Sequence, residues 1–105
     1  MAVTPLSLQP GMALQQDLQT VFTAPGGTTV VTSGVAANSA DSITTLSVSV
    51  TRAGGQAVFL IPARQVATMG TDLLPELSGL VLNKGDVLSA GGAGLQLVLN
   101  GYSLS

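Results

Sequence analysis

Few residues of this chain could carry out acid–base, nucleophilic or metal chemistry. It has no histidine, cysteine or tryptophan, and only three basic and five acidic residues among 105. Histidine and cysteine are the usual side chains that titrate near neutral pH, and both are frequent metal ligands. The composition therefore argues against an enzyme. It predicts no catalytic residues, no metal site and no cofactor.

Asp72 and Glu76 stand four positions apart and could form a general acid–base pair or part of a calcium site. A glycosidase needs two carboxylates on either side of a sugar, which aromatic side chains usually hold. Calcium takes six or more oxygen ligands, usually from several carboxylates. The surrounding segment, Pro62–Ser78, offers neither aromatic residues nor further acids. We therefore interpret both residues as solvated loop charges.

Three other features have a chemical and a structural interpretation. Gly91–Gly94 could bind phosphate, but such loops lead into a helix and this one precedes a strand-like alternation, so we interpret it as a hairpin loop. Lys84 could activate a serine, yet Asn83–Asp86 has the composition of a turn. Tyr102 is the single tyrosine, so a carbohydrate-binding module, which usually stacks sugars on aromatic rings, is the weaker alternative.

The elements that would position such residues are β-strands. In Thr45–Thr51 and again from Leu95 to Leu99, leucine or valine recurs at every second position, which is the period of a strand with one buried face. The alternation slips at Gly101, which predicts a β-bulge or bend. We expect these side chains on inner faces: Leu46, Val48, Val50, Leu95, Leu97 and Leu99.

The rest of the chain extends this pattern into an all-β fold. Further strands are predicted at Leu14–Phe22, Thr28–Ala37, Gln56–Ile61, Gly79–Leu82 and Val87–Ala90. Turn sequences separate them at Pro25–Gly27, Asn38–Ser42, Ala53–Gly55, Asn83–Asp86 (a short hairpin) and Gly91–Gly94. Roughly seven or eight strands of this kind predict a two-sheet antiparallel β-sandwich, jelly-roll-like.

Two segments do not fit the strand pattern. Met1–Gly11 contains Pro5 and Pro10 and is predicted to be an extended N-terminal arm, ahead of a β-sandwich domain at residues 12–105. Pro62–Ser78 is predicted to be a long link with one short helical turn. Apolar residues outside the strands are candidates for protein interaction: Val3, Leu6, Leu8, Val66, Met69, Leu73 and Leu74.

Charge narrows the choice of partners. The net charge is −2, and charged residues make up 8% of the chain against roughly 25% in ordinary soluble domains. Three basic residues are too few to neutralise a nucleic-acid backbone, and no apolar stretch approaches the roughly 20 residues of a membrane helix. The N-terminal sequence MAVTPLSLQPG lacks the charge and apolar run of a signal peptide. We expect that the protein does not bind nucleic acid, does not associate with a membrane and is not exported. We also expect that other copies of the chain cover part of its surface.

The order of these segments resembles small virion proteins of tailed bacteriophages. The segments that carry the resemblance are Thr23–Thr29, Val30–Asn38, Thr44–Thr51, Ala57–Ile61, the Leu-x-x-Gly-Asp-x-Leu stretch Leu82–Leu88, and the terminal strand Val98–Leu104. Together they cover residues 20 to 104. The family usually closes its last strand on an acidic residue, whereas this chain ends Tyr102-Ser103-Leu104-Ser105.

The resemblance implies a non-enzymatic virion structural protein assembled in the host cytoplasm. A capsid decoration (cement) protein that bridges and stabilises capsid subunits is the favoured role. A neck or tail component, or a receptor- or carbohydrate-binding tip, is the alternative. The implied partners are the major capsid protein and further copies of the chain, with a trimer favoured. The resemblance brings no catalytic residues.

Overall fold

The computed structural model describes residues 3–39 and 41–104 of the chain. Residues 1, 2, 40 and 105, which fall in the expected arm, the expected Asn38–Ser42 turn and the end of the expected domain, lie outside the described residues. The described ranges contain nine strands and one three-residue 3-10 helix. None of their helical structure is long and apolar enough to cross a membrane.

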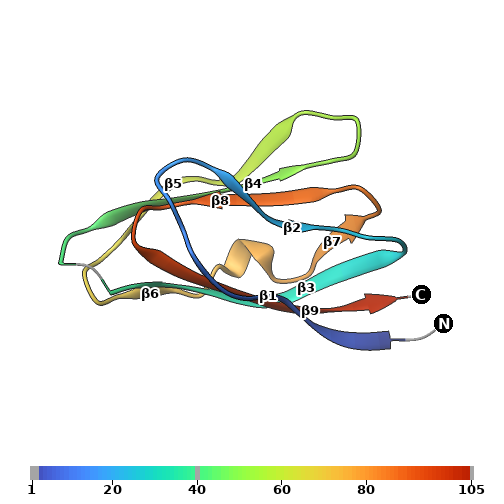
Figure 1. Cartoon of the computed structure of the whole chain (residues 1–105), viewed down its shortest axis with the longest axis horizontal. Coiled ribbons are helices and arrows are strands. Elements are labelled where there is room, and N and C mark those ends of the chain that lie inside the picture. Colours follow the sequence, from blue (N-terminus) through green and yellow to red (C-terminus); the bar gives the residue numbers. More distant parts are fainter. Residues whose placement is uncertain (1–2, 40, 105) are drawn as a thin grey trace.

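The strands form two antiparallel sheets packed face to face (Figure 1). Sheet A runs in the order β1 (Val3–Ala13), β9 (Leu95–Leu104) and β3 (Thr28–Asn38), and the short strands β6 (Thr71–Asp72) and β7 (Leu80–Asn83) both pair with β3. Sheet B runs in the order β2 (Gln19–Thr23), β8 (Val87–Gly91), β4 (Thr44–Thr51) and β5 (Ala57–Val66). The prediction of an all-β, two-sheet antiparallel sandwich is confirmed.

The pairing has the nested order of a jelly roll. β1 pairs with β9, β2 with β8, β3 with β6 and β7, and β4 with β5. The first half of the chain therefore pairs antiparallel with the second half, as in one long hairpin, and this hairpin is folded so that its strands form two sheets. That is the jelly-roll arrangement. Its consequence for function is that the connections gather at the two ends of an elongated molecule, as Figure 1 shows.

The core between the sheets is almost entirely aliphatic. All six residues expected on inner faces, namely Leu46, Val48, Val50, Leu95, Leu97 and Leu99, are buried. Alternation explains this, because successive side chains of a strand point to opposite faces. Leu82 and Leu88 complete the layer from β7 and β8. With few aromatic residues available, many small side chains fill the interior, which requires close packing of each one.

The N-terminal segment is extended but is not an arm outside the sandwich. Residues 3–13 form β1, which pairs with β9 along its whole length and places Leu8 in the core. Pro5 and Pro10 do not prevent this, because β1 is the edge strand of sheet A and an edge strand needs hydrogen bonds on one side only. The expected separation of an arm from the sandwich is therefore corrected.

The expected link Pro62–Ser78 is also more regular than its sequence indicates. β5 continues through Pro62 to Val66, with irregular register against β4 on either side of that proline. A bulge on an edge strand accommodates proline without breaking the sheet. Ser47 of β4 donates a hydrogen bond to the Pro62 carbonyl at 2.8 Å. Further along, the expected helical turn is present as the 3-10 helix η1 (Pro75–Leu77).

Two of the expected hairpins are connections between the sheets. The turn at Asn83–Asp86 leads from β7 in sheet A to β8 in sheet B, and Gly91–Gly94 leads from β8 back to β9. Ala53–Gly55 alone among these three joins neighbouring strands of one sheet. A register shift between β9 and β3 lies opposite Gly101, but the extra residue is on β3 between Val31 and Ser33, and β9 itself keeps its alternation past Gly101.

Candidate interaction surfaces

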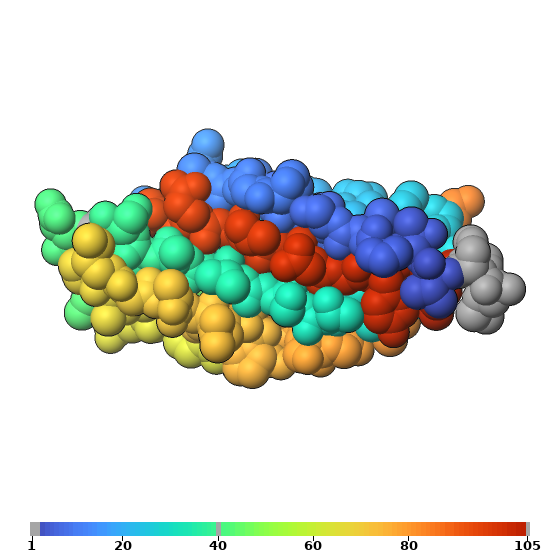
Figure 2. Space-filling view, turned by 90° about the horizontal axis from the view of Figure 1, so that it is seen from below, coloured from blue at the N-terminus to red at the C-terminus, as the bar shows by residue number. Residues whose placement is uncertain are grey.

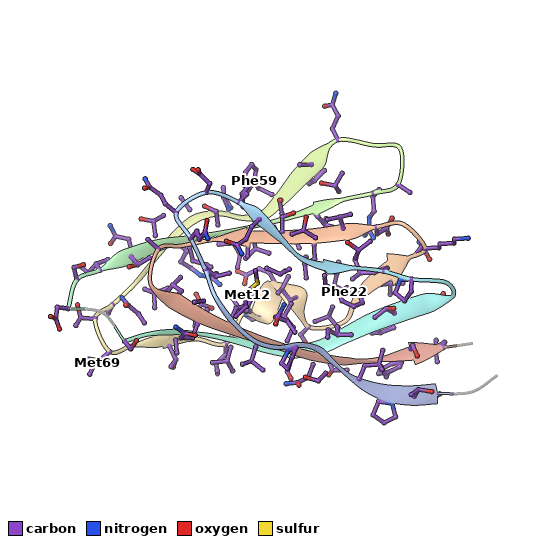
Figure 3. All side chains as sticks on the ribbon, viewed as in Figure 1. Met12, Phe22, Phe59 and Met69 are labelled. Carbon is purple, nitrogen blue, oxygen red and sulfur yellow. The ribbon has the colours of Figure 1, made fainter. Side chains whose placement is uncertain are left out.

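The structure does not bring the expected interaction residues together. Three of the seven are buried in the core and cannot contact a partner in the folded chain: Leu8, Val66 and Leu74. Leu6 is half-buried against the same core. Val3, Met69 and Leu73 are exposed, but β1 begins at one end of the molecule and Met69 lies at the other (Figure 3). Alternate residues of a strand face opposite ways, so the structure leaves Val3, Met69 and Leu73 as the exposed members of this set.

Asp72 and Glu76 form an ion-pair cluster with Arg64 of β5. The Arg64 guanidinium contacts Asp72 through Nε at 2.7 Å and Nη2 at 2.9 Å, and it also donates to both oxygens of Glu76. These hydrogen bonds lower the pKa of the Glu76 carboxyl. The two carboxylates are therefore bound to an arginine that ties sheet B to β6 and η1, and are not separate loop charges as expected.

Asp86 is a second structural acid, and the sequence did not single it out. Its buried carboxylate accepts hydrogen bonds from the backbone N–H groups of Asn83 and Ala53, and it pairs with Arg52 at 2.7 Å. The hydrogen bond from Asn83, then those from Arg52 and Ala53, lower the pKa of Asp86 below its ordinary value of 3.8. Asp86 therefore joins the β4–β5 hairpin to the β7–β8 connection.

We expect Asp86→Ala to lower the melting temperature at pH 7 by about 5 °C or more, because two backbone donors and Arg52 lose their acceptor. Since the folded pKa is lowered, the stabilisation is complete above about pH 4 and is lost as the pH falls through the folded value. Thermal unfolding monitored by circular dichroism should show the wild type and variant converging in acid. Asp17→Ala, at an exposed carboxyl, is the control, and a difference in melting temperature that stays the same from pH 7 into acid would contradict the assignment.

No cluster within residues 3–39 and 41–104 gathers three or more acidic, histidine or cysteine side chains. The acids that do cluster are bound by Arg64 and Arg52. The notable features of the described surface are instead apolar, and they form two surfaces.

The first surface is the loop end, formed by the described residues of four connections: 14–18, 39 with 41–43, 67–70, and 92–94. Figure 1 shows them at the same end of the sandwich. Hydrogen bonds hold them together: Gly92 N–H donates to Gln15 O at 2.7 Å, the Thr44 hydroxyl to Ala93 O at 3.0 Å, and Asn38 N–H to Gly70 O at 2.9 Å. These loops are thus supported by one another and by the strands beneath them.

Exposed apolar side chains project from the loop end. Leu18 is 42%, Ile43 59% and Met69 75% exposed. A shallow depression of about 370 Å³ lies beside Ile43, and its lining is evenly polar and apolar: Gln16, Ser42, Ile43, Thr44, Thr45 and Ala93. Large apolar side chains held in water by an ordered scaffold are a feature of interaction sites.

The second surface is the outer face of sheet A near the chain termini. Pro5 of β1, Tyr102 of β9, Val30 of β3 and Val81 of β7 are directly opposed across four neighbouring strands. Opposed residues point to the same face of a sheet. Because the next residues, Val31 and Leu82, are buried, this row points outward.

A second row continues the same face, with Val3 opposite Leu104 and Leu104 opposite Thr28. We call the apolar members of the two rows the terminal patch: Val3, Pro5, Val30, Val81, Tyr102 and Leu104. Figure 2 shows this face, with β1, β9, β3 and β7 side by side. Val3 is 61% and Val81 44% exposed.

The outer face of sheet B has a different chemistry. Its central row opposes Thr20, Ser89 and Ser49, and hydroxyl groups also come from Ser47 and Thr51. These hydroxyl groups make this face more polar than the outer face of sheet A near the chain termini, although Ser49 itself is buried. Phe59, at the β5 end of the central row, and Val87, in the next row, are apolar side chains on the same face.

Only some of the residues that form these two surfaces could be identified from the sequence. Val30, Tyr102 and Leu104 stand in predicted strands, and Tyr102 and Leu104 point away from the core because β9 continues the alternation in which Leu95, Leu97 and Leu99 face inward. Ile43 and Leu18 lie in turns whose proximity follows from the nested pairing. Met69, which takes a left-handed backbone conformation in its turn, was the one loop-end residue identified in advance.

Comparisons of this chain with protein-family profiles, with curated proteins and with solved structures found no match.

Proposed function

We propose that this protein is a non-enzymatic structural protein of a tailed-bacteriophage virion, a decoration protein that binds the capsid shell and bridges its subunits. The observation that carries the proposal is the loop end, where Leu18, Ile43 and Met69 project from three of its four mutually supported loops. The jelly-roll order of the strands and the resemblance of residues 20–104 to virion proteins also support it.

The loop end suits attachment to a protein surface. Full burial of a Leu, Ile or Met side chain contributes about 1.5–3 kcal/mol of transfer free energy, of which association retains a part. The scaffold is rigid, so little ordering cost is added on binding. The start of β1 and the end of β9 lie at the far end of a molecule 45 Å long, so attachment by the loop end leaves them pointing away from the shell (Figure 1).

Replacing both Ile43 and Met69 with lysine should weaken binding to capsids of the cognate phage at least about tenfold, because each lysine would have to be desolvated in the contact. Both side chains are exposed, so the variant should keep the wild-type melting temperature. Co-sedimentation of purified protein with capsids measures the effect. Val58→Lys, at a similarly exposed site on the β4–β5 hairpin, is the control. Undiminished binding by the double variant would contradict the proposed contact.

The alternative role, a neck or tail component or a receptor-binding tip, is favoured by one observation. The depression at the loop end offers the Gln16 amide and the hydroxyls of Ser42 and Thr45 beside Ile43, groups that can hydrogen-bond a polar ligand such as a sugar. In that role the loop end would face away from the particle. Binding of the wild type to a glycan array, lost on Thr45→Lys, would favour the tip over the decoration protein.

A further inference from the structure

We infer that a second copy of this chain docks face to face on the terminal patch, giving a twofold dimer through the outer faces of the two A sheets. The inference goes beyond the proposed function, because it concerns a different surface and a different partner from the loop end.

The first argument is the chemistry of the terminal patch. One row is apolar on all four strands of this end of sheet A, and the second row is apolar on β1 and β9, so the apolar side chains are neighbours and not isolated. It contains Tyr102, the only tyrosine of the chain, and aromatic residues are enriched in the buried centres of interfaces. The hydroxyl-rich outer face of sheet B lacks such rows.

The second argument is charge. β1, β9, β3 and β7, the four strands of the terminal patch, contain no Asp, Glu, Lys or Arg. In a twofold contact each surface meets an identical surface, so a charged side chain near the centre would lie opposite the same charge on the second copy and be repelled by it. An uncharged face avoids that repulsion, and it offers no ion-pair complement for a differently charged partner. A copy of the same chain therefore fits this face.

The third argument is size. The molecule measures 45 × 27 × 18 Å, and in Figure 2 the outer face of sheet A extends along the longest and the shortest of these directions. The whole outer face, 45 by 18 Å, sets the upper limit of such a contact, which is close to the roughly 800 Å² that each partner buries in a standard interface, and the terminal patch occupies the end of it near the chain termini. Two such sheets can pack with their strands about 30° apart, as the sheets of a sandwich do.

The fourth argument concerns the direction of approach. Addition of a strand to the long edge of sheet A would require pairing with β1, whose free side carries Pro5 and Pro10, and the opposite edge offers only the short strands β6 and β7. Proline cannot donate to a new ladder and protects edges against such pairing. A second copy is therefore directed to the face of the sheet and not to its β1 edge.

Analytical ultracentrifugation and light scattering of the purified full chain test the inference. The wild type should have the mass of a dimer at about 100 µM, and Val81→Lys should raise the dissociation constant at least about tenfold, since each dimer would then bury two ammonium groups. Val81 is exposed, so the folded monomer should survive, which its circular dichroism spectrum checks. Val58→Lys on sheet B is the matched control and should remain dimeric.

Three results would overturn the inference. One is a monomeric wild type at this concentration, and another is a dimer that Val81→Lys leaves intact. The third is a trimer, because a closed threefold ring uses two different surfaces of each copy. A monomeric wild type whose capsid binding is lost on Val81→Lys would assign the terminal patch to the capsid protein. That outcome would overturn the dimer and leave the proposed function standing. If the wild type were instead a dimer that did not bind capsids, the dimer would stand and the proposed function would be overturned.

Discussion

Gly101→Ala is expected to lower the free energy of unfolding by more than about 3 kcal/mol, a large share of the 5–15 kcal/mol typical of a domain. A Cβ atom at this position would lie 2.2 Å from the carbonyl oxygen of Val30 and 3.0 Å from a methyl carbon of Leu8. The first contact is with the backbone of the neighbouring strand, which cannot move without breaking the β3–β9 pairing. The glycine is therefore required where two strands approach closely beside a bulge.

Chemical denaturation followed by circular dichroism measures this change, with Gly26→Ala as the matched control. A Cβ atom at Gly26 would meet nothing within 4 Å, so that variant should be as stable as the wild type or slightly more stable. Equal stability of the two variants would show that β9 does not approach β3 as closely as described.

Deletion of residues 1–11 is expected to abolish the cooperative fold, and not to leave a stable sandwich without its arm. The deletion removes most of β1, including Leu8, which is only 7% exposed. It also removes the hydrogen bond from the Gln9 amide to Val21 O at 3.1 Å, which links β1 to β2 in the other sheet. β9 would become an unprotected edge strand, so we expect aggregation during purification.

A pair of point variants separates an edge strand from a loose arm without a deletion. Leu8→Ala should cost about 2–5 kcal/mol of unfolding free energy, as other buried leucines do. Ser7→Ala should change it by less than about 0.5 kcal/mol, since Ser7 of the same strand is exposed and lies outside the terminal patch. If the truncated chain were soluble and melted at the wild-type temperature, β1 would not belong to the core.

Much of the fold could be predicted from local sequence pattern. The alternation in β4 and β9 identified both the strands and their buried side chains, because one solvated and one buried face impose a period of two. Proline was the misleading signal. Pro5 and Pro62 indicate breaks in a central strand, but each lies on an edge strand, and edge position depends on the pairing of distant segments.

The interaction surfaces were harder to predict, since exposure is set by the other sheet. Val3 and Leu8 share one strand, yet only Leu8 contacts the core. Arg64 and Asp72 belong to different sheets, and their ion pair follows from the closure of the sandwich. The loop end likewise combines four connections that the chain visits far apart in sequence.

Cryo-electron microscopy of the intact virion is the most direct test of the central claim. The account predicts many copies of the 45 Å sandwich distributed over the capsid shell, each with Ile43 and Met69 against capsid protein and its termini pointing outward. Copies confined to one vertex or to the tail, or copies whose loop end faces away from the particle, would contradict it.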